Sequence, residues 1–107
     1  MSVDITVSID SNNNITVIPD PAPSGHGRNI PFKWTIVTNG WTFTSKGIDI
    51  PNNGGQFSGG NSTAQGRQFH WVDKNDNTNP YKYDVNVTNG TTTLNRDPTI
   101  QNQGDGR

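Results

Sequence analysis

The sequence predicts an all-β fold, an antiparallel β-sandwich of about seven to eight short strands. Apolar and polar residues alternate in short runs along most of the chain, which is the pattern of half-buried strands. Gly, Pro and Asn separate these runs at intervals of roughly ten residues, as turns do in a sandwich. All nine acidic residues are Asp and Leu occurs once, whereas Ile and Val are frequent, so the composition favours strands and turns over helices.

The first predicted elements are a hairpin and a loop. Apolar residues alternate with polar ones over 3–9, residues 10–14 supply a turn, and the chain returns over 15–18, which predicts an antiparallel hairpin. Residues 19–29 are rich in Pro and Gly and are expected to form a crossing loop.

A second hairpin is predicted around the dipeptide Asn39-Gly40, because Asn-Gly is the pair most favourable for a type I′ turn. The strand over 32–36 has an aromatic and aliphatic face, and the partner strand begins at Trp41. A short edge strand over 48–50 follows and is ended by a proline.

Residues 51–66 contain one large apolar side chain, Phe57, among Gly, Asn, Ser and Thr. This segment is long for a connection, so it is predicted to be either a mobile loop or a functional loop anchored by Phe57. Strand patterns return over 68–72 and 81–87, and a second Asn-Gly turn at Asn89-Gly90 leads into a last strand.

A chain of 107 residues has room for one hydrophobic core. We expect a single domain over residues 1–95, followed by a polar C-terminal tail over 96–107. The net charge is −1 and the eight basic residues are scattered singly, so neither nucleic acid nor a membrane is expected as a partner. No signal peptide or membrane-spanning run is visible, which predicts a cytoplasmic protein or one released by a signal-independent route.

The order of strand patterns resembles that of the cupredoxin-like and immunoglobulin-like β-sandwiches. It runs through the segments ITVSID, PFKWTIV, WTF, GIDI, FHWVD, YKYDVNVT and DPTI. It is also similar to that of small uncharacterised bacterial proteins of about this length. The resemblance implies a Greek-key arrangement of the strands. Cupredoxins bind copper through a cysteine, and this chain has none, so only the scaffold is implied.

An Asp- and Asn-rich loop has part of the spacing of a calcium-binding loop. Oxygen-bearing side chains occupy its first, third, fifth, seventh and twelfth positions: Asp73, Asn75, Asn77, Asn79 and Asp84. Calcium collects about six to eight oxygen ligands, which makes this loop the one predicted metal site and calcium the one candidate cofactor. Thr78 stands where such loops carry glycine. The alternative is an Asn-rich hairpin loop that uses left-handed backbone conformations.

Three residues are predicted contacts for a ligand or partner. Trp41 lies beside the Asn-Gly turn and is expected to be partly exposed, where it would contact a sugar or a protein. Phe57 would anchor its loop, and His26 lies between glycines that allow a close approach of the backbone. Neither His26 nor His70 belongs to a nucleophile-elbow or zinc-binding motif, so no catalytic residue is predicted.

These observations predict a non-enzymatic binding or structural module. It would assemble with itself or with another protein, using sheet edges as templates for pairing. The first alternative is a calcium-stabilised carbohydrate-binding module, and a small enzyme is the second.

Overall fold

The computed structural model describes residues 2–104 and confirms the prediction of an all-β fold. A single turn of 3₁₀-helix, η1 (Ala64–Gly66), joins two of the strands. In the described part of the chain, no helix has the length and apolar character needed to cross a membrane. The strands are β1 (Val3–Ile9), β2 (Ile15–Ile18), β3 (Ala22–Pro23), β4 (Ile30–Ile36), β5 (Thr42–Asp49), β6 (Phe57–Thr63), β7 (Gln68–Asp73), β8 (Pro80–Lys82), β9 (Asp84–Thr88), β10 (Thr93–Arg96) and β11 (Thr99–Gln101).

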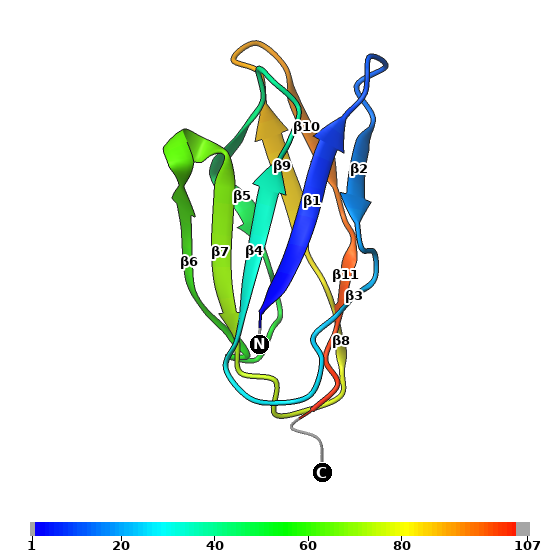
Figure 1. The fold of residues 1–107 in the computed structure, drawn as a ribbon, viewed down its shortest axis with the longest axis vertical. Coiled ribbons are helices and arrows are strands. Elements are labelled where there is room, and N and C mark those ends of the chain that lie inside the picture. The colour runs from blue at the N-terminus through cyan, green and yellow to red at the C-terminus, as the bar shows by residue number, and fades with distance from the viewer. Residues whose placement is uncertain (1, 105–107) are drawn as a thin grey trace.

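The strands form one large sheet and two small ones. The large sheet has the order β2-β1-β4-β7-β6, and the small sheets have the orders β10-β9-β5 and β3-β11-β8. Figure 1 shows the large sheet in front, β5 and β9 behind it, and β3, β8 and β11 together at the lower right. The core therefore lies between the large sheet and the strands behind it.

The prediction of purely antiparallel sheets is wrong. Strand β1 pairs with β2 as the expected antiparallel hairpin, but it also pairs in parallel with β4, where Val3 lies opposite Phe32. Strand β11 pairs in parallel with β3, where Ile100 lies opposite Ala22. Alternation along a strand indicates which face is buried and says nothing about the direction of its neighbour, so the sequence pattern could not distinguish the two cases.

The hairpin predicted at Asn39-Gly40 is also wrong. Strands β4 and β5 belong to different sheets, so this turn carries the chain from one layer to the other. Residues 39 and 40 do form a turn, in which Gly40 has a φ of 86°. The turn at Asn89-Gly90, in contrast, joins the antiparallel pair β9 and β10, as predicted.

The segment over 51–66, expected to be a loop without secondary structure, contains strand β6. It pairs antiparallel with β7 at the edge of the large sheet. Only Phe57 is buried in this strand and its other residues are exposed. Because the strand shows no apolar alternation, the sequence contains no signal for it.

Aromatic side chains connect the two layers of the core. The ring centroids of Trp34 on β4 and Tyr83, which precedes β9, lie 5.4 Å apart. Trp34 Nε1 donates a hydrogen bond of 3.0 Å to the tyrosine hydroxyl. The ring centroids of Phe43 on β5 and Phe69 on β7 lie 5.8 Å apart. Burial raises the pKa of Tyr83 above its ordinary value. The predicted aromatic face of β4 is therefore the centre of the core.

The last strands place part of the predicted tail within the fold. Strand β10 extends to Arg96, and β11 pairs with both β3 and β8. Ile100 is fully buried in this position. Residues 105–107 of the predicted tail lie outside the described residues.

Candidate functional site

The five predicted calcium ligands lie on different elements of the fold. Asp73 ends β7 in the large sheet, whereas Asp84 begins β9 in a different sheet, opposite Asp49 of β5. Among residues 2–104, no group of three or more His, Cys, Asp or Glu side chains is placed to hold a metal ion. The Asp- and Asn-rich segment is the crossover from β7 to β8 and not a hairpin loop, because these strands do not pair.

Asn75, the central residue of this segment, is fully buried, and its side-chain amide forms hydrogen bonds to other residues of the protein. Its Nδ2 donates to the carbonyl oxygens of Gly25, Gly27 and Gly104, at 3.0, 2.7 and 2.9 Å. Its Oδ1 accepts from the Oγ of Ser24 at 2.9 Å and from two backbone N–H groups after β11, both at 3.1 Å. The amide thus joins three segments distant in sequence, and no lone pair faces a site for a cation.

The backbone of Asn75 has a φ of 56°, in the left-handed region that the alternative interpretation of this loop predicted. An asparagine tolerates this conformation better than most residues do. The sequence signal therefore marked an unusual loop correctly, and the chemistry assigned to it does not fit the geometry.

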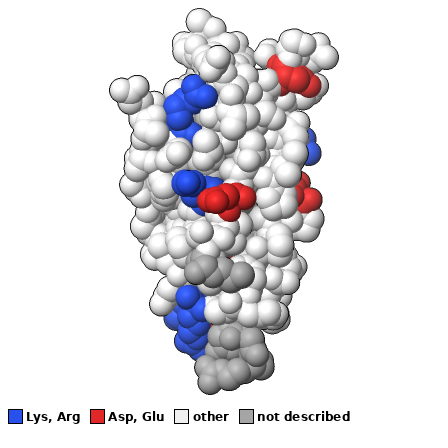
Figure 2. Space-filling model, viewed as in Figure 1, with Lys and Arg blue, Asp and Glu red and all other residues white. Residues whose placement is uncertain are grey.

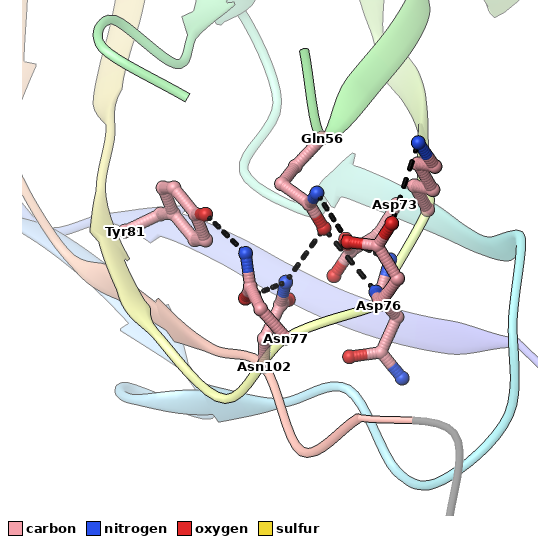
Figure 3. A network of polar contacts seen from close by, with 8 residues as sticks. Gln56, Asp73, Asp76, Asn77, Tyr81 and Asn102 are labelled. Carbon is pink, nitrogen blue, oxygen red and sulfur yellow. Dashed lines mark hydrogen bonds and ion pairs between the residues drawn. The ribbon is translucent and has the colours of Figure 1, made fainter. Parts of the chain in front are cut away.

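A second cluster of polar side chains surrounds Asp73 (Figure 3). The Asp73 side chain is fully buried, its Oδ1 accepts a 3.0 Å hydrogen bond from the N–H of Asn75, and the amide of Asn102 lies against its carboxyl group. Burial raises the pKa of this carboxyl to about 6. Asn102 Nδ2 also lies 3.3 Å from Gln56 Oε1 and 3.1 Å from Asn77 Oδ1.

At the surface of this cluster lies a second carboxyl group, that of Asp76. Gln56 Nε2 donates a hydrogen bond of 2.6 Å to its Oδ1, and Lys74 Nζ lies 3.3 Å from its Oδ2. The hydrogen bond from Gln56 is the main reason why the pKa of Asp76 lies below its ordinary value. The two carboxyl groups therefore differ in character, since one is exposed and ionised and the other is buried and accepts its proton more readily.

A groove of about 580 Å³ adjoins the cluster. Its two walls are the loop after β5 and the start of β8, and it is lined by Pro51, Asn52, Asn53, Gly54, Asn79, Pro80, Tyr81 and Lys82. A smaller hollow of about 200 Å³ continues it, sharing Pro51 and Lys82 and adding Tyr83, Asp84 and Asp97. The volume of the main groove falls within the range of about 300 to 1,000 Å³ that is usual for small-ligand sites.

Tyr81 is held in one orientation at the groove. Asn77 Nδ2 donates a hydrogen bond of 2.9 Å to its hydroxyl, and its ring makes a T-shaped contact with Phe57 at 5.6 Å. Tyr81 is half-buried and packs against the core. Phe57, a predicted contact residue, is itself buried and supports the groove from behind.

The walls of the groove carry two amides without partners. The side chains of Asn52 and Asn79 are exposed and make no hydrogen bond within residues 2–104. The backbone of each wall is fixed, because Asn53 caps its own loop through hydrogen bonds to Ile50 and Gly55, and Asn79 O accepts from Asn102 N at 3.1 Å. Sequence spacing could not reveal this site, because one wall is the loop after β5 and the other is the segment at β8, and the two are distant in sequence.

The other predicted contact residues lie elsewhere. His26 is exposed in the loop before β4. The expectation that Trp41 is partly exposed is wrong, because its side chain is only 8% accessible and joins the core. The fold brings neither residue to the groove, whose lining contains neither a histidine nor a tryptophan.

Charged side chains are few on the face that Figure 2 shows. Lys33 and Asp4 approach each other to 3.9 Å on the outer surface of the large sheet, where both are exposed. An exposed pair of this kind contributes little to stability.

No protein-family model matches the chain, and no curated protein sequence matches it.

Proposed function

We propose that this chain is a non-enzymatic binding module on a Greek-key β-sandwich scaffold, and that its ligand binds in the groove between residues 51–54 and 79–82. The observation that carries the proposal is a groove with rigid walls on which the amides of Asn52 and Asn79 have no partner in the described structure. Polar groups held in a concave site without intramolecular partners are available to fix the orientation of a ligand.

The composition of the groove supports binding more than catalysis. Its lining contains no histidine, cysteine or carboxyl group, and its one amine, that of Lys82, lies 3.8 Å from Asp97 Oδ2. General acid and base catalysis needs a titratable group in reach of the substrate, with a pKa adjusted to the reaction. The one strongly shifted carboxyl group nearby is that of Asp73, which is fully buried.

The alternative of assembly through sheet edges has weaker support. The outer edge strand β6 has an irregular register between Ser58 and Asn61, where two glycines interrupt it. At the other edge of the large sheet, β2 has four residues and is followed directly by Pro19. Bulges, short strands and proline are the features that keep natural edge strands from pairing.

An NMR titration of ¹⁵N-labelled protein tests the proposal. The probes are a set of neutral oligosaccharides, a set of acidic oligosaccharides and a set of short peptides, each added in excess. At least one set should shift the amide signals of Asn52, Asn53, Gly54, Asn79 and Tyr81 more than those of the remaining chain. If no probe shifts these signals, or if the shifts lie elsewhere on the molecule, the proposal is wrong.

Light scattering after size-exclusion separates the binding role from the assembly role. A binding module of this kind should be monomeric at all concentrations tested. A stable oligomer that is dissociated by Ser62→Lys, at an exposed position of β6, would instead favour assembly through that edge.

A further inference from the structure

We infer that the groove between residues 51–54 and 79–82 binds a neutral oligosaccharide. This inference rests on the proposed binding function and adds the chemical class of the ligand. Three properties of the groove carry it: a tyrosine ring fixed in place, two amides without partners, and the balance of charge around them.

The ring of Tyr81 is a prepared stacking surface. Its T-shaped contact with Phe57, with an angle of 80° between the rings, covers at most one face of the tyrosine. The hydrogen bond from Asn77 to its hydroxyl and the contact with Phe57 leave the ring little rotational freedom to lose on binding. A flat aromatic face with a polar tip suits the apolar C–H face of a sugar ring and its rim of hydroxyl groups.

The free amides supply the hydrogen bonds that a sugar requires. Asn52 and Asn79 stand on opposite walls, and each offers a donor and an acceptor on one planar group. A pair of adjacent hydroxyl groups on a sugar presents the complementary donor and acceptor. Hydrogen bonds of Asn53 and Asn102 fix the backbone of both walls, so the points from which the two amides extend are set before the ligand arrives.

The charges around the groove favour a neutral ligand. Lys82 is the only charged residue in the lining of the main groove. Its ammonium group lies 3.8 Å from Asp97 Oδ2 and donates a hydrogen bond of 3.3 Å to the backbone oxygen of Asp97. The adjoining hollow contains Asp84 and Asp97. An anionic ligand that extended from the groove into this hollow would meet two carboxylates against one amine.

A peptide is a poorer fit for the same space. An extended peptide would have to pair with the open side of β8, which has only three residues and begins with Pro80. Proline has no N–H group to give to a new strand. The continuity of the groove with the smaller hollow, through Pro51 and Lys82, instead suits a short chain of sugar units.

Titrations of the full chain with neutral hexasaccharides of glucose, mannose and xylose test the inference, with binding measured by calorimetry and NMR. At least one should bind and shift the signals of Asn52, Asn79 and Tyr81. Tyr81→Ala should weaken binding by about tenfold or more, and Asn79→Ala by about threefold to tenfold. Tyr81→Phe keeps the ring and should stay within about threefold of the unmodified protein.

Two controls keep the test independent of folding. Asn79→Ala removes an exposed side chain that makes no hydrogen bond in residues 2–104, so this variant should fold even if Tyr81→Ala does not. Asn13 is matched to Asn52, since both are exposed and have φ near +60°. Asn52→Ala should weaken binding, and Asn13→Ala, in the turn between β1 and β2, should leave it unchanged.

The outcomes separate this inference from the function on which it rests. If acidic oligosaccharides or peptides shift the groove signals and neutral ones do not, the ligand class is wrong and the binding function stands. If no probe affects the groove, both are wrong. If a neutral hexasaccharide binds with the same affinity to the Asn52 and Asn79 variants, the groove is not its site and the inference is overturned.

Discussion

Asn102 places its side-chain amide against the buried carboxyl group of Asp73, and the direction of this contact depends on one proton. With its nitrogen toward Asp73, the amide donates to an ionised carboxylate, but its oxygen then faces the oxygens of Gln56 and Asn77. With its oxygen toward Asp73, the nitrogen donates to those two residues and the carboxyl must supply a proton. Burial raises the pKa of Asp73 and so favours the second arrangement as the pH falls, whereas a hydrogen bond from Asn102 to the carboxylate opposes this shift.

The stability of the protein should therefore fall as the pH rises from about 4 to 6. The carboxyl of Asp73 ionises near 3.8 in the unfolded chain, and burial raises its pKa to about 6 in the fold, so between these values the unfolded state releases a proton that the folded state keeps. The free energy of unfolding should decrease by up to about 3 kcal/mol across this interval and then level off. Urea unfolding at a series of pH values measures the change.

Asp73→Asn is the control for this effect. It replaces the protonated carboxyl with a neutral group of the same shape, so the variant should match the unmodified protein near pH 4 and keep that stability to pH 7.5. Asp10 and Asp76 have pKa values below their ordinary range, so their contribution to the free energy of unfolding increases with pH. This contribution changes only below about pH 4. A stability that rises between pH 4 and 6, or a variant that retains the decrease, would contradict the prediction.

Calcium should not change the thermal stability. The amide oxygen of Asn75 accepts three hydrogen bonds from the protein, and Asp84 lies in another sheet from Asp73. A ligand that binds only the folded state stabilises it by an amount that grows with the logarithm of the ligand concentration above Kd, so a real site would respond to millimolar calcium. We expect melting midpoints in calcium and in chelator to agree within about one degree. A difference of several degrees between the two melting midpoints would contradict this prediction and support a calcium site.

Asn75→Ala should be among the most damaging single substitutions in the chain. It removes six hydrogen bonds from a buried region and leaves Gly27 O and the N–H of Gly104 with no other partner among the described residues, and we expect a loss of about 3 to 5 kcal/mol in the free energy of unfolding. Urea unfolding of the purified variant measures this loss, and failure to fold counts as its upper limit.

Asn52→Ala separates the side-chain effect from the backbone effect. Asn52 has the same φ of 56° as Asn75, but its side chain is exposed and makes no hydrogen bond in the described structure. The substitution should cost at most about 1 kcal/mol, which is the price of alanine in the left-handed region. If both variants lose equal stability, the amide network contributes little and the prediction is wrong.

The sequence identified buried faces better than it identified strand partners. Alternation located β1, β2, β4, β7 and β9, because a strand with one buried face has that period wherever it lies. The same Asn-Gly dipeptide joins two sheets at Asn39 and closes a hairpin at Asn89. The difference comes from the packing of distant elements, such as Trp34 against Tyr83, which no short window contains.

The candidate site shows the same limit. The sequence marked Asn75 as part of a special loop, but its partners follow β3 and β11 and are 48 to 51 residues away on one side and 28 to 29 on the other. The groove depends on the juxtaposition of Asn52, in the loop after β5, and Asn79, which directly precedes β8. Such sites form only in the tertiary structure. Residue type could therefore indicate some of the residues involved, but it could not predict which of them lie together.

The edge strand β6 offers the sharpest test of packing, at Gly60. A Cβ atom added at this position would overlap the indole ring of Trp71, whose Nε1 donates a hydrogen bond of 2.8 Å to Ile48 O. The indole is rigid, so Gly60→Ala must displace it and break that bond, at a cost of about 1 to 3 kcal/mol. Because Trp34 and Trp41 are buried, a displaced Trp71 should also shift the fluorescence emission to longer wavelength.

Gly59→Ala is the matched control, one residue away on the same strand. Gly59 has a φ of 75°, and an added Cβ there meets no atom of the described residues within 4 Å. Its substitution should cost about 1 to 2 kcal/mol from backbone strain alone and leave the tryptophan emission unchanged. Because the costs of the two variants overlap, the emission distinguishes them: a Gly60→Ala spectrum identical to that of Gly59→Ala would show that β6 moves to accommodate the methyl group and that Trp71 does not depend on Gly60.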